Sequence, residues 1–347
     1  MERVAETTWG NVPNSYSSID EEYEASTLGV GLLDRSKVGR LRLTGDDSLD
    51  LLNRLSTNKL TDLNVGQGVR TVLTSPKGRI LDLLVVTKRD SHLVVMTSPQ
   101  NRQKVMDWVE FYTIAEDVVV QDLTEQTAML ALIGPRAGKV LDGISRGAVP
   151  SLQPYSSTSI TIAGLDALAV RTDFASLPGY DIIVQSSDAG KLWRTLLNTD
   201  TNFSIKPVGM DALEVIRIEQ GVPAYDSELS EDINPLEANL MAFVSLDKGC
   251  YVGQEVVARL NTYKKVQKYL VGLSWSSDFS PAANAALFVE GKKVGWITSH
   301  ATSQRLSKRI GLGCVRKAHC EPGVQLTVGT PDSKAVVFVE ALPFKSE

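Results

Sequence analysis

Residues 247–255 read DKGCYVGQE, with a cysteine between two glycines. Gly249 and Gly253 allow a tight backbone turn that presents the thiol of Cys250. Lys248 adds a positive charge near the sulfur, and a helix that begins at Gly253 would place its N-terminus close to it. Both effects favour the thiolate, which is the reactive form of cysteine. The alternative is a buried and inert cysteine before a helix, which is the commoner role of an isolated cysteine.

The composition of the 347-residue chain is that of an ordinary globular protein, with 43% hydrophobic and 22% charged residues. This length suffices for two or three domains with their own cores. No run of about 18 apolar residues occurs, which excludes a membrane-spanning helix. The balance of 36 basic against 41 acidic side chains argues against a non-specific nucleic-acid coat protein. Residues 1–25 lack the regions of a secretory signal, so we expect a cytoplasmic protein, with a processed organellar protein as the alternative.

The three cysteines and three histidines limit the chemistry further. An odd and sparse cysteine count indicates a reducing compartment and argues against a disulfide framework. Cys314, His319 and Cys320 come nearest to a metal-ligand spacing, but they lack the paired Cys-x2-Cys knuckles of structural zinc sites, so no metal site is predicted. The signatures of zinc hydrolases, P-loop proteins and Rossmann dinucleotide-binding proteins are also missing.

The pattern of apolar residues predicts helices segregated among antiparallel strands, which is an α+β fold rather than a doubly wound parallel sheet. Expected strands cover residues 38–43, 83–87, 93–97, 128–133, 167–171 and 180–185, and expected helices cover 49–55, 101–114, 188–197 and 209–219. Residues 1–25 are expected to be a flexible extension, and residues 26–273 to hold two mixed subdomains. After a shift to Ser, Pro and Ala at 274–283, short strands broken by Gly and Pro predict a small β-barrel over residues 274–347.

The segment KGCYVGQE at 248–255 resembles the signature of the YgfZ-type folate-binding proteins, which assist iron–sulfur cluster assembly or repair. These proteins are relatives of the glycine-cleavage T-protein, an aminomethyltransferase that uses tetrahydrofolate. Further segments resemble motifs of this superfamily: GLLDRS at 31–36, LIGPRA at 132–137, RIEQG at 217–221 with Tyr225 and PLEA at 235–238, and KVGWITS at 293–299. The resemblance covers nearly the whole chain, from residue 28 to residue 330.

The resemblance implies a three-part T-protein-like fold with a central folate channel and a C-terminal small β-barrel. It also implies that Arg217, Glu219 and Tyr225 lie near the folate pocket, with Arg259 for the anionic tail. Such a pocket needs a carboxylate for the pterin N–H edge, apolar faces for stacking and cations for the tail. The alternative for Arg217 and Glu219 is a structural ion pair. Their spacing of two residues places them on different helix faces, so each would need another partner.

The chain departs from the T-protein at some of these motifs. The transferase motif Gly-Gly-Ile-x-Asp-Asp corresponds to GRILDL at 78–83, so one of its two aspartates, Asp82, is present and Arg79 replaces a glycine. In SLPGYDI at 176–182, Leu177 stands where the transferase has a glutamate that contacts the pterin. Loss of an aspartate beside the folate nitrogens would weaken aminomethyl transfer. Asp82 is therefore either a catalytic carboxylate or a polar residue beside an apolar strand.

Three functions are compatible with these residues. The main hypothesis is a folate-dependent factor for iron–sulfur cluster assembly or repair, with Cys250 as the working thiol and Lys248 beside it. The resemblance implies iron–sulfur enzymes as partners, including tRNA-modifying ones, without direct nucleic-acid or membrane binding. The second hypothesis is a tetrahydrofolate-dependent aminomethyl or methyl transferase or demethylase, in which Asp82 and Arg217 act and Cys250 is incidental. The third is a folate-binding regulator without chemistry of its own.

A small basic cluster precedes the predicted barrel. Lys264, Lys265 and Lys268 are interleaved there with Tyr263 and Tyr269. Such a cluster could hold a polyglutamate tail or contact an acidic partner. The alternative is a solvated connector that leads into the barrel, which is the commoner role of a short lysine cluster.

Overall fold

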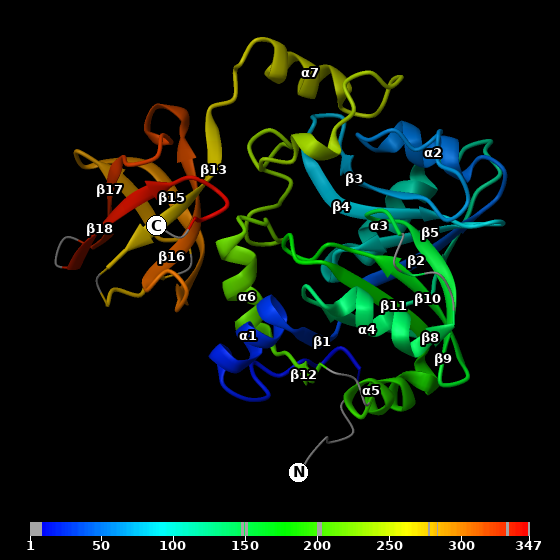
Figure 1. The fold of residues 1–347 in the computed structure, drawn as a ribbon. Helices are drawn as coiled ribbons and strands as arrows, with labels where there is room; N and C mark the ends of the chain where they lie inside the picture. Colours follow the sequence, from blue (N-terminus) through cyan, green and yellow to red (C-terminus); the bar gives the residue numbers. More distant parts are fainter. Residues whose placement is uncertain are drawn as a thin grey trace. The chain divides into compact units, whose positions relative to one another are not determined.

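The computed structural model describes residues 9–146, 149, 152–199, 203–276, 278–282, 284–330 and 333–345. The chain divides into two compact units, and Figure 1 labels most of their helices and strands. The first unit combines the residues up to 71 with 83–213, and the second combines 72–82 with the residues from 214 onward. The second unit therefore includes a short piece from the N-terminal half of the chain.

A seven-stranded sheet forms the larger part of the first unit. Its strand order is β12 (Ile205–Pro207), β1 (Val30–Asp34), β7 (Thr127–Ile133), β11 (Gly179–Gln185), β10 (Leu165–Arg171), β9 (Ser157–Ile162) and β8 (Ser145–Arg146). β1 and β12 pair in parallel, and the other neighbours pair antiparallel. β7 is a nearly continuous apolar run, as expected for a strand that is covered on both faces. The helices α4 (Ala137–Ile144) and α5 (Ala189–Leu197) contribute buried side chains to the same core.

The second sheet has five strands, in the order β3 (Gly68–Thr74), β4 (Ile80–Lys88), β5 (Leu93–Thr97), β2 (Gly39–Thr44) and β6 (Val119–Asp122). The helices α1 (Ile19–Leu28), α2 (Ser48–Leu55) and α3 (Arg102–Tyr112) complete the first unit. Met96 of β5 packs with Met129 of β7 and Val170 of β10, so side chains from both sheets share one buried cluster. The predicted α+β fold is confirmed.

The second unit contains a closed six-stranded barrel, as predicted. Its strand order is β13 (Lys268–Trp275), β16 (Lys308–Arg316), β15 (Lys292–Ser303), β14 (Ala286–Val289), β17 (Gln325–Thr330) and β18 (Ser333–Glu340). Leu273, Ile297 and Val315 belong to its apolar core. The barrel begins at Lys268 rather than at 274, because the change in composition at 274–283 follows the first strand instead of preceding it. The unit also contains the C-terminal part of α6 (Met210–Glu219) and all of α7 (Gln254–Thr262).

Residues 9–25 do not form the flexible extension that the sequence predicted. The side chain of Glu22, in α1, is buried there. Its carboxylate accepts hydrogen bonds from the backbone N–H groups of Tyr16, Ser17 and Gly209. The expectation was wrong because an acidic side chain can be buried where several donors surround it. The first eight residues lie outside the described part of the chain.

Within the described part of the chain, no helix has both the length and the apolar character that crossing a membrane requires.

Candidate functional site

Residues 72–82 and the motif segment 247–255 form one local structure in the second unit. Gly253 caps the N-terminus of α7 with a φ of 86°, a left-handed conformation that favours glycine. A Cβ on Gly253 would lie 2.5 Å from the carbonyl oxygen of Ser75 and 3.0 Å from the backbone of Gly78. The two glycines therefore let the β3–β4 turn and the start of α7 pack backbone against backbone.

Hydrogen bonds fix this packing. The hydroxyl of Thr74, at the end of β3, donates to the carbonyl of Val252 at 2.6 Å. On the same hairpin, the N–H of Ile80 donates to the carbonyl of Ile233 at 2.9 Å. A side-chain hydroxyl thus anchors the motif segment to the hairpin, and a backbone hydrogen bond anchors the preceding loop.

Cys250 is the exposed member of the three cysteines. Cys314 is buried, and burial raises the pKa of its thiol to about 12. Cys320 is half-buried, and burial raises the pKa of its thiol as well. The expectation of a buried cysteine is therefore wrong for Cys250, which is exposed, and a reactive role of its thiol stays a prediction.

Lys248 is buried, although it lies two residues from the exposed thiol. Only 6% of its surface is exposed, and its Nζ lies 5.4 Å from the centroid of the Tyr251 ring. Loss of solvation lowers the pKa of the Lys248 amine to about 8, and burial raises the pKa of Tyr251 to about 12. The sequence predicted Lys248 as a positive charge near the sulfur. The structure shows an amine that exchanges its proton much nearer to neutral pH than an ordinary lysine does.

Asp82 lies within β4 and has no exposed surface. The strand therefore begins before the predicted residue 83 and includes Asp82, and the choice between a catalytic and a structural carboxylate stays open. A buried carboxyl is tolerated only where N–H or O–H groups donate hydrogen bonds to it. The N–H groups of a ligand are donors of this kind.

Arg217 lies in α6 at the centre of an ion-pair network. Its guanidinium donates to Glu214, to the fully buried Glu228 at 2.8 Å and to the hydroxyl of Ser299 in β15 at 2.7 Å. Burial alone lowers the pKa of Arg217, but the hydrogen bond to Glu214 and the charges of Glu228 and Glu214 raise it above its ordinary value. These contacts give Arg217 a structural role between α6 and the barrel.

Glu219 forms a second network on the same helix. It is 1% exposed, and it accepts hydrogen bonds from the hydroxyl of Ser303 and from Nε of Arg305, the latter at 3.0 Å. Arg217 and Glu219 therefore have separate partners, as their spacing predicted. Of the other predicted pocket residues, Tyr225 is half-buried in the loop after α6, and Arg259 is exposed in the last turn of α7.

Arg79, which stands where the T-protein motif has a glycine, connects two of the family-like motifs. Its guanidinium donates to the carbonyl of Asp232 at 2.9 Å and lies 3.4 Å from the carboxylate of Glu237. Glu237 belongs to the segment PLEA and also accepts from the N–H of Asn234 at 3.0 Å. The arginine thus fastens the hairpin to this segment.

Two further motifs meet within the first unit. Arg35 of the segment GLLDRS donates to both carboxylate oxygens of Asp181 at 2.7 Å. Asp181 is fully buried and also accepts from the hydroxyl of Thr172 at 2.8 Å. Leu177, in the position of the missing glutamate, is half-buried.

Sequence reasoning missed the residues that complete the two networks of α6, which are Glu228, Ser299, Ser303 and Arg305. Ser299 lies 82 residues from Arg217 along the chain, and Ser303 lies 84 residues from Glu219. No local spacing could reveal such partners. The available signal was two polar residues at buried positions of a barrel strand.

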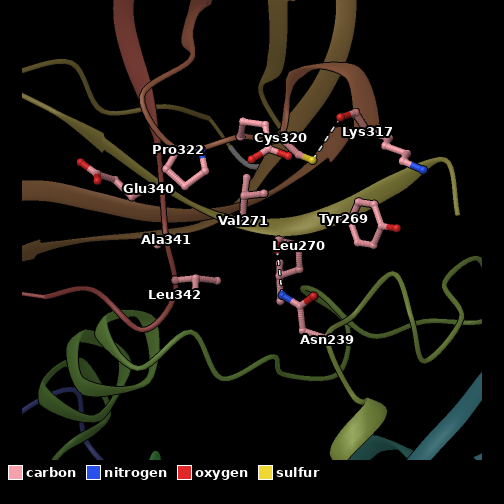
Figure 2. A pocket seen from close by; sticks show the side chains of 11 residues that line it. Asn239, Tyr269, Leu270, Val271, Lys317, Cys320, Pro322, Glu340, Ala341 and Leu342 are labelled. Atoms are coloured by element: carbon pink, nitrogen blue, oxygen red, sulfur yellow. Dashed lines mark hydrogen bonds between the residues drawn. The ribbon is translucent and has the colours of Figure 1, made fainter. Parts of the chain in front are cut away.

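A pocket of about 410 Å³ lies beside β13, the segment around Cys320 and the residues after β18 (Figure 2). Inside it the Cys320 thiol donates to the carbonyl of Lys317 at 3.2 Å, and the side-chain amide of Asn239 donates to the carbonyl of Leu270 at 2.9 Å. The residues predicted for the folate pocket do not line it.

Two family models match the chain. The GCVT N-terminal domain matches residues 3–248, and the glycine cleavage T-protein C-terminal barrel domain matches residues 268–345. The second match begins at the first residue of β13 and agrees with the observed start of the barrel.

Individual proteins are also similar over most of the chain. The aminomethyltransferase of Halalkalibacterium halodurans is 30% identical over 96% of this chain and 91% of its own length. A chloroplastic protein of Arabidopsis thaliana, provisionally named a transferase, is 33% identical over 95% of this chain and 76% of its own length. The crystal structure of the glycine cleavage system aminomethyltransferase T from Bartonella henselae superposes with a TM-score of 0.87 at 21% identity, over 96% of this chain and 91% of that one. That likeness shows the fold.

Proposed function

Since the chain belongs to the glycine-cleavage T-protein family, we propose that it is a tetrahydrofolate-dependent transferase that takes its one-carbon unit from an aminomethyl or methyl donor. The names of its relatives support transfer chemistry more than the iron–sulfur role that the KGCYVGQE segment suggested. The observation that carries the proposal is the buried carboxyl of Asp82, in the hairpin to which the motif segment is anchored.

The described residues fit tetrahydrofolate in part. When bound, tetrahydrofolate supplies the nitrogen atoms that accept the one-carbon unit. Asp82 would lie beside the folate nitrogens that accept the one-carbon unit, and the exposed Arg259 suits the anionic tail. Glu219 does not suit the pterin, because both of its carboxylate oxygens already accept hydrogen bonds within the protein. Arg217 is engaged in the same way, so both residues support the site instead of lining it.

In this proposal two side chains act on the donor. The Asp82 carboxylate orients the donor nitrogen and stabilises positive charge that develops on it. Lys248, with a pKa of about 8, can take up or release a proton near neutral pH. Cys250 has no part in this chemistry.

The test is a transfer assay with the purified chain, tetrahydrofolate and an aminomethyl donor, with methylenetetrahydrofolate and formaldehyde as the measured products. We expect folate-dependent product from the wild type and a loss of about 100-fold or more in Asp82→Asn, because a carboxylate aimed at developing charge contributes that much. Asp247→Asn, which removes the same charge from an exposed position of the motif segment, serves as the control and keeps the rate. Absence of product from the wild type, or equal losses in both variants, would contradict the proposal.

The exposure of Cys250 favours a second function, the maintenance of iron–sulfur clusters with folate as ligand. Its partners would be iron–sulfur enzymes, among them tRNA-modifying ones. The test places Cys250→Ala in cells that lack the native gene and follows an iron–sulfur-dependent tRNA thiolation, while folate binding is measured on the purified variant. Collapse of thiolation with intact folate binding would support this function, and unchanged thiolation would exclude it.

For the location of the protein, the chloroplastic name of the Arabidopsis relative supports a processed organellar protein over a cytoplasmic one. Imaging of a fluorescent protein fused to the C-terminus, in the native organism, would distinguish an organellar from a cytoplasmic location.

A further inference from the structure

Three cations line a pocket of about 290 Å³ on the barrel. Lys268 of β13, Lys293 of β15 and Arg316 of β16 line it. Lys268 and Arg316 are directly opposite each other in the antiparallel register of β13 and β16. Like charges that face each other across two strands destabilise a sheet. A pair of cations without a compensating carboxylate is therefore a candidate for a binding function.

No acidic side chain lines this pocket, and none within the described residues forms an ion pair with these three cations. The carboxylate of Glu237, whose charge acts on the Cys314 thiol, is already held by Arg79 and by the N–H of Asn234. The excess positive charge of the pocket is therefore available to an anion.

The lining of the pocket also includes an aromatic side chain. Trp296 pairs with Cys314 in the register of β15 and β16, and both residues line the pocket. Nζ of Lys268 lies 5.1 Å from the centroid of the Trp296 ring. The Cys314 thiol stays neutral at physiological pH, since burial raises its pKa to about 12. A ligand in this pocket would meet both the Trp296 indole and the three cations.

We propose that this pocket binds a small organic dianion, an apolar or aromatic body that carries either a phosphate or two carboxylates. The cations supply charge-assisted hydrogen bonds to the oxyanion, and the indole of Trp296 supplies a face for the body. The pocket volume is at the lower end of the range for small-molecule sites, which fits a ligand of one ring rather than a large cofactor. This site is separate from the transfer chemistry, because the residues proposed for that chemistry do not line it.

The first experiment is calorimetric titration of the full chain with phenyl phosphate, phenylsuccinate and the neutral benzyl alcohol. We expect one of the two anions to bind with a Kd of about 1 mM or lower at low salt, and more weakly as salt screens the cations. Tighter binding of phenyl phosphate identifies an organic phosphate, and tighter binding of phenylsuccinate identifies a dicarboxylate. Absence of binding of both anions at about 10 mM, or equal binding of benzyl alcohol, overturns the proposal.

Matched variants locate the site. Lys293→Gln should weaken binding about fivefold and Arg316→Gln about tenfold, in proportion to their charge-assisted contacts. Lys292→Gln removes the same charge from the adjacent exposed residue of β15, which does not line the pocket, and should leave the Kd within about twofold. Melting temperatures confirm that the variants are folded. Equal weakening in Lys292→Gln and Lys293→Gln, or unchanged binding in Arg316→Gln, overturns the site.

Discussion

Lys248 illustrates how burial alone changes the chemistry of one side chain. Its pKa is about 8 in the folded chain and 10.5 for an ordinary lysine, so between these values the unfolded chain binds the extra proton. The free energy of unfolding therefore rises with pH between 8 and 10.5. Below pH 8, Lys248 is protonated in both states and adds no pH dependence.

We expect Lys248→Met to remove this rise. The measurement is the free energy of unfolding in urea for wild type and variant at several pH values from 7 to 10.5, with the difference between the two as the readout. Lys77→Met, an exposed lysine in the β3–β4 turn, should change the pH profile little. A constant difference between wild type and Lys248→Met across this range would contradict the lowered pKa.

At the level of elements, the junction of the β3–β4 hairpin with α7 depends on backbone proximity. Gly253→Ala would force a left-handed alanine and bring its Cβ against Ser75 and Gly78. We expect a loss of about 1–3 kcal/mol in the free energy of unfolding. Gly249→Ala is the matched control, because no atom lies within 4 Å of the position of its Cβ. Equal stabilities of the two variants in denaturant would show that the junction tolerates the extra atom.

The sequence predicted most elements well where one apolar pattern decides them. The strand expected at 93–97 is β5 as observed, and the helix expected at 188–197 is α5 to within one residue. Prediction failed where distant groups decide the outcome. Glu22 is buried by backbone donors that include Gly209, and Arg217 and Glu219 each have a partner in β15. The sequence predicted a helix that begins at Gly253, but it could not predict the contact between Gly253 and Gly78.

At the scale of the whole molecule, the three cysteines occupy three environments. We expect a thiol reagent at pH 8 to label Cys250 first and Cys320 more slowly, and to reach Cys314 only after unfolding. Mass spectrometry of digested samples at successive times gives the order, and labelling in denaturant gives all three. Early labelling of Cys314 in the native chain would contradict its buried place in the barrel.

The assignment of residues 72–82 to the second unit has a consequence for how the protein is made. A ribosome releases the hairpin while most of the residues that it packs against, including Gly253, remain to be translated. The turn of the hairpin stays without these contacts until Gly253 has been made, although every residue of the first unit has emerged by residue 213. For the same reason, a cut at any single peptide bond divides at least one unit between two fragments, and no single recombination event would transfer either unit without residues of the other.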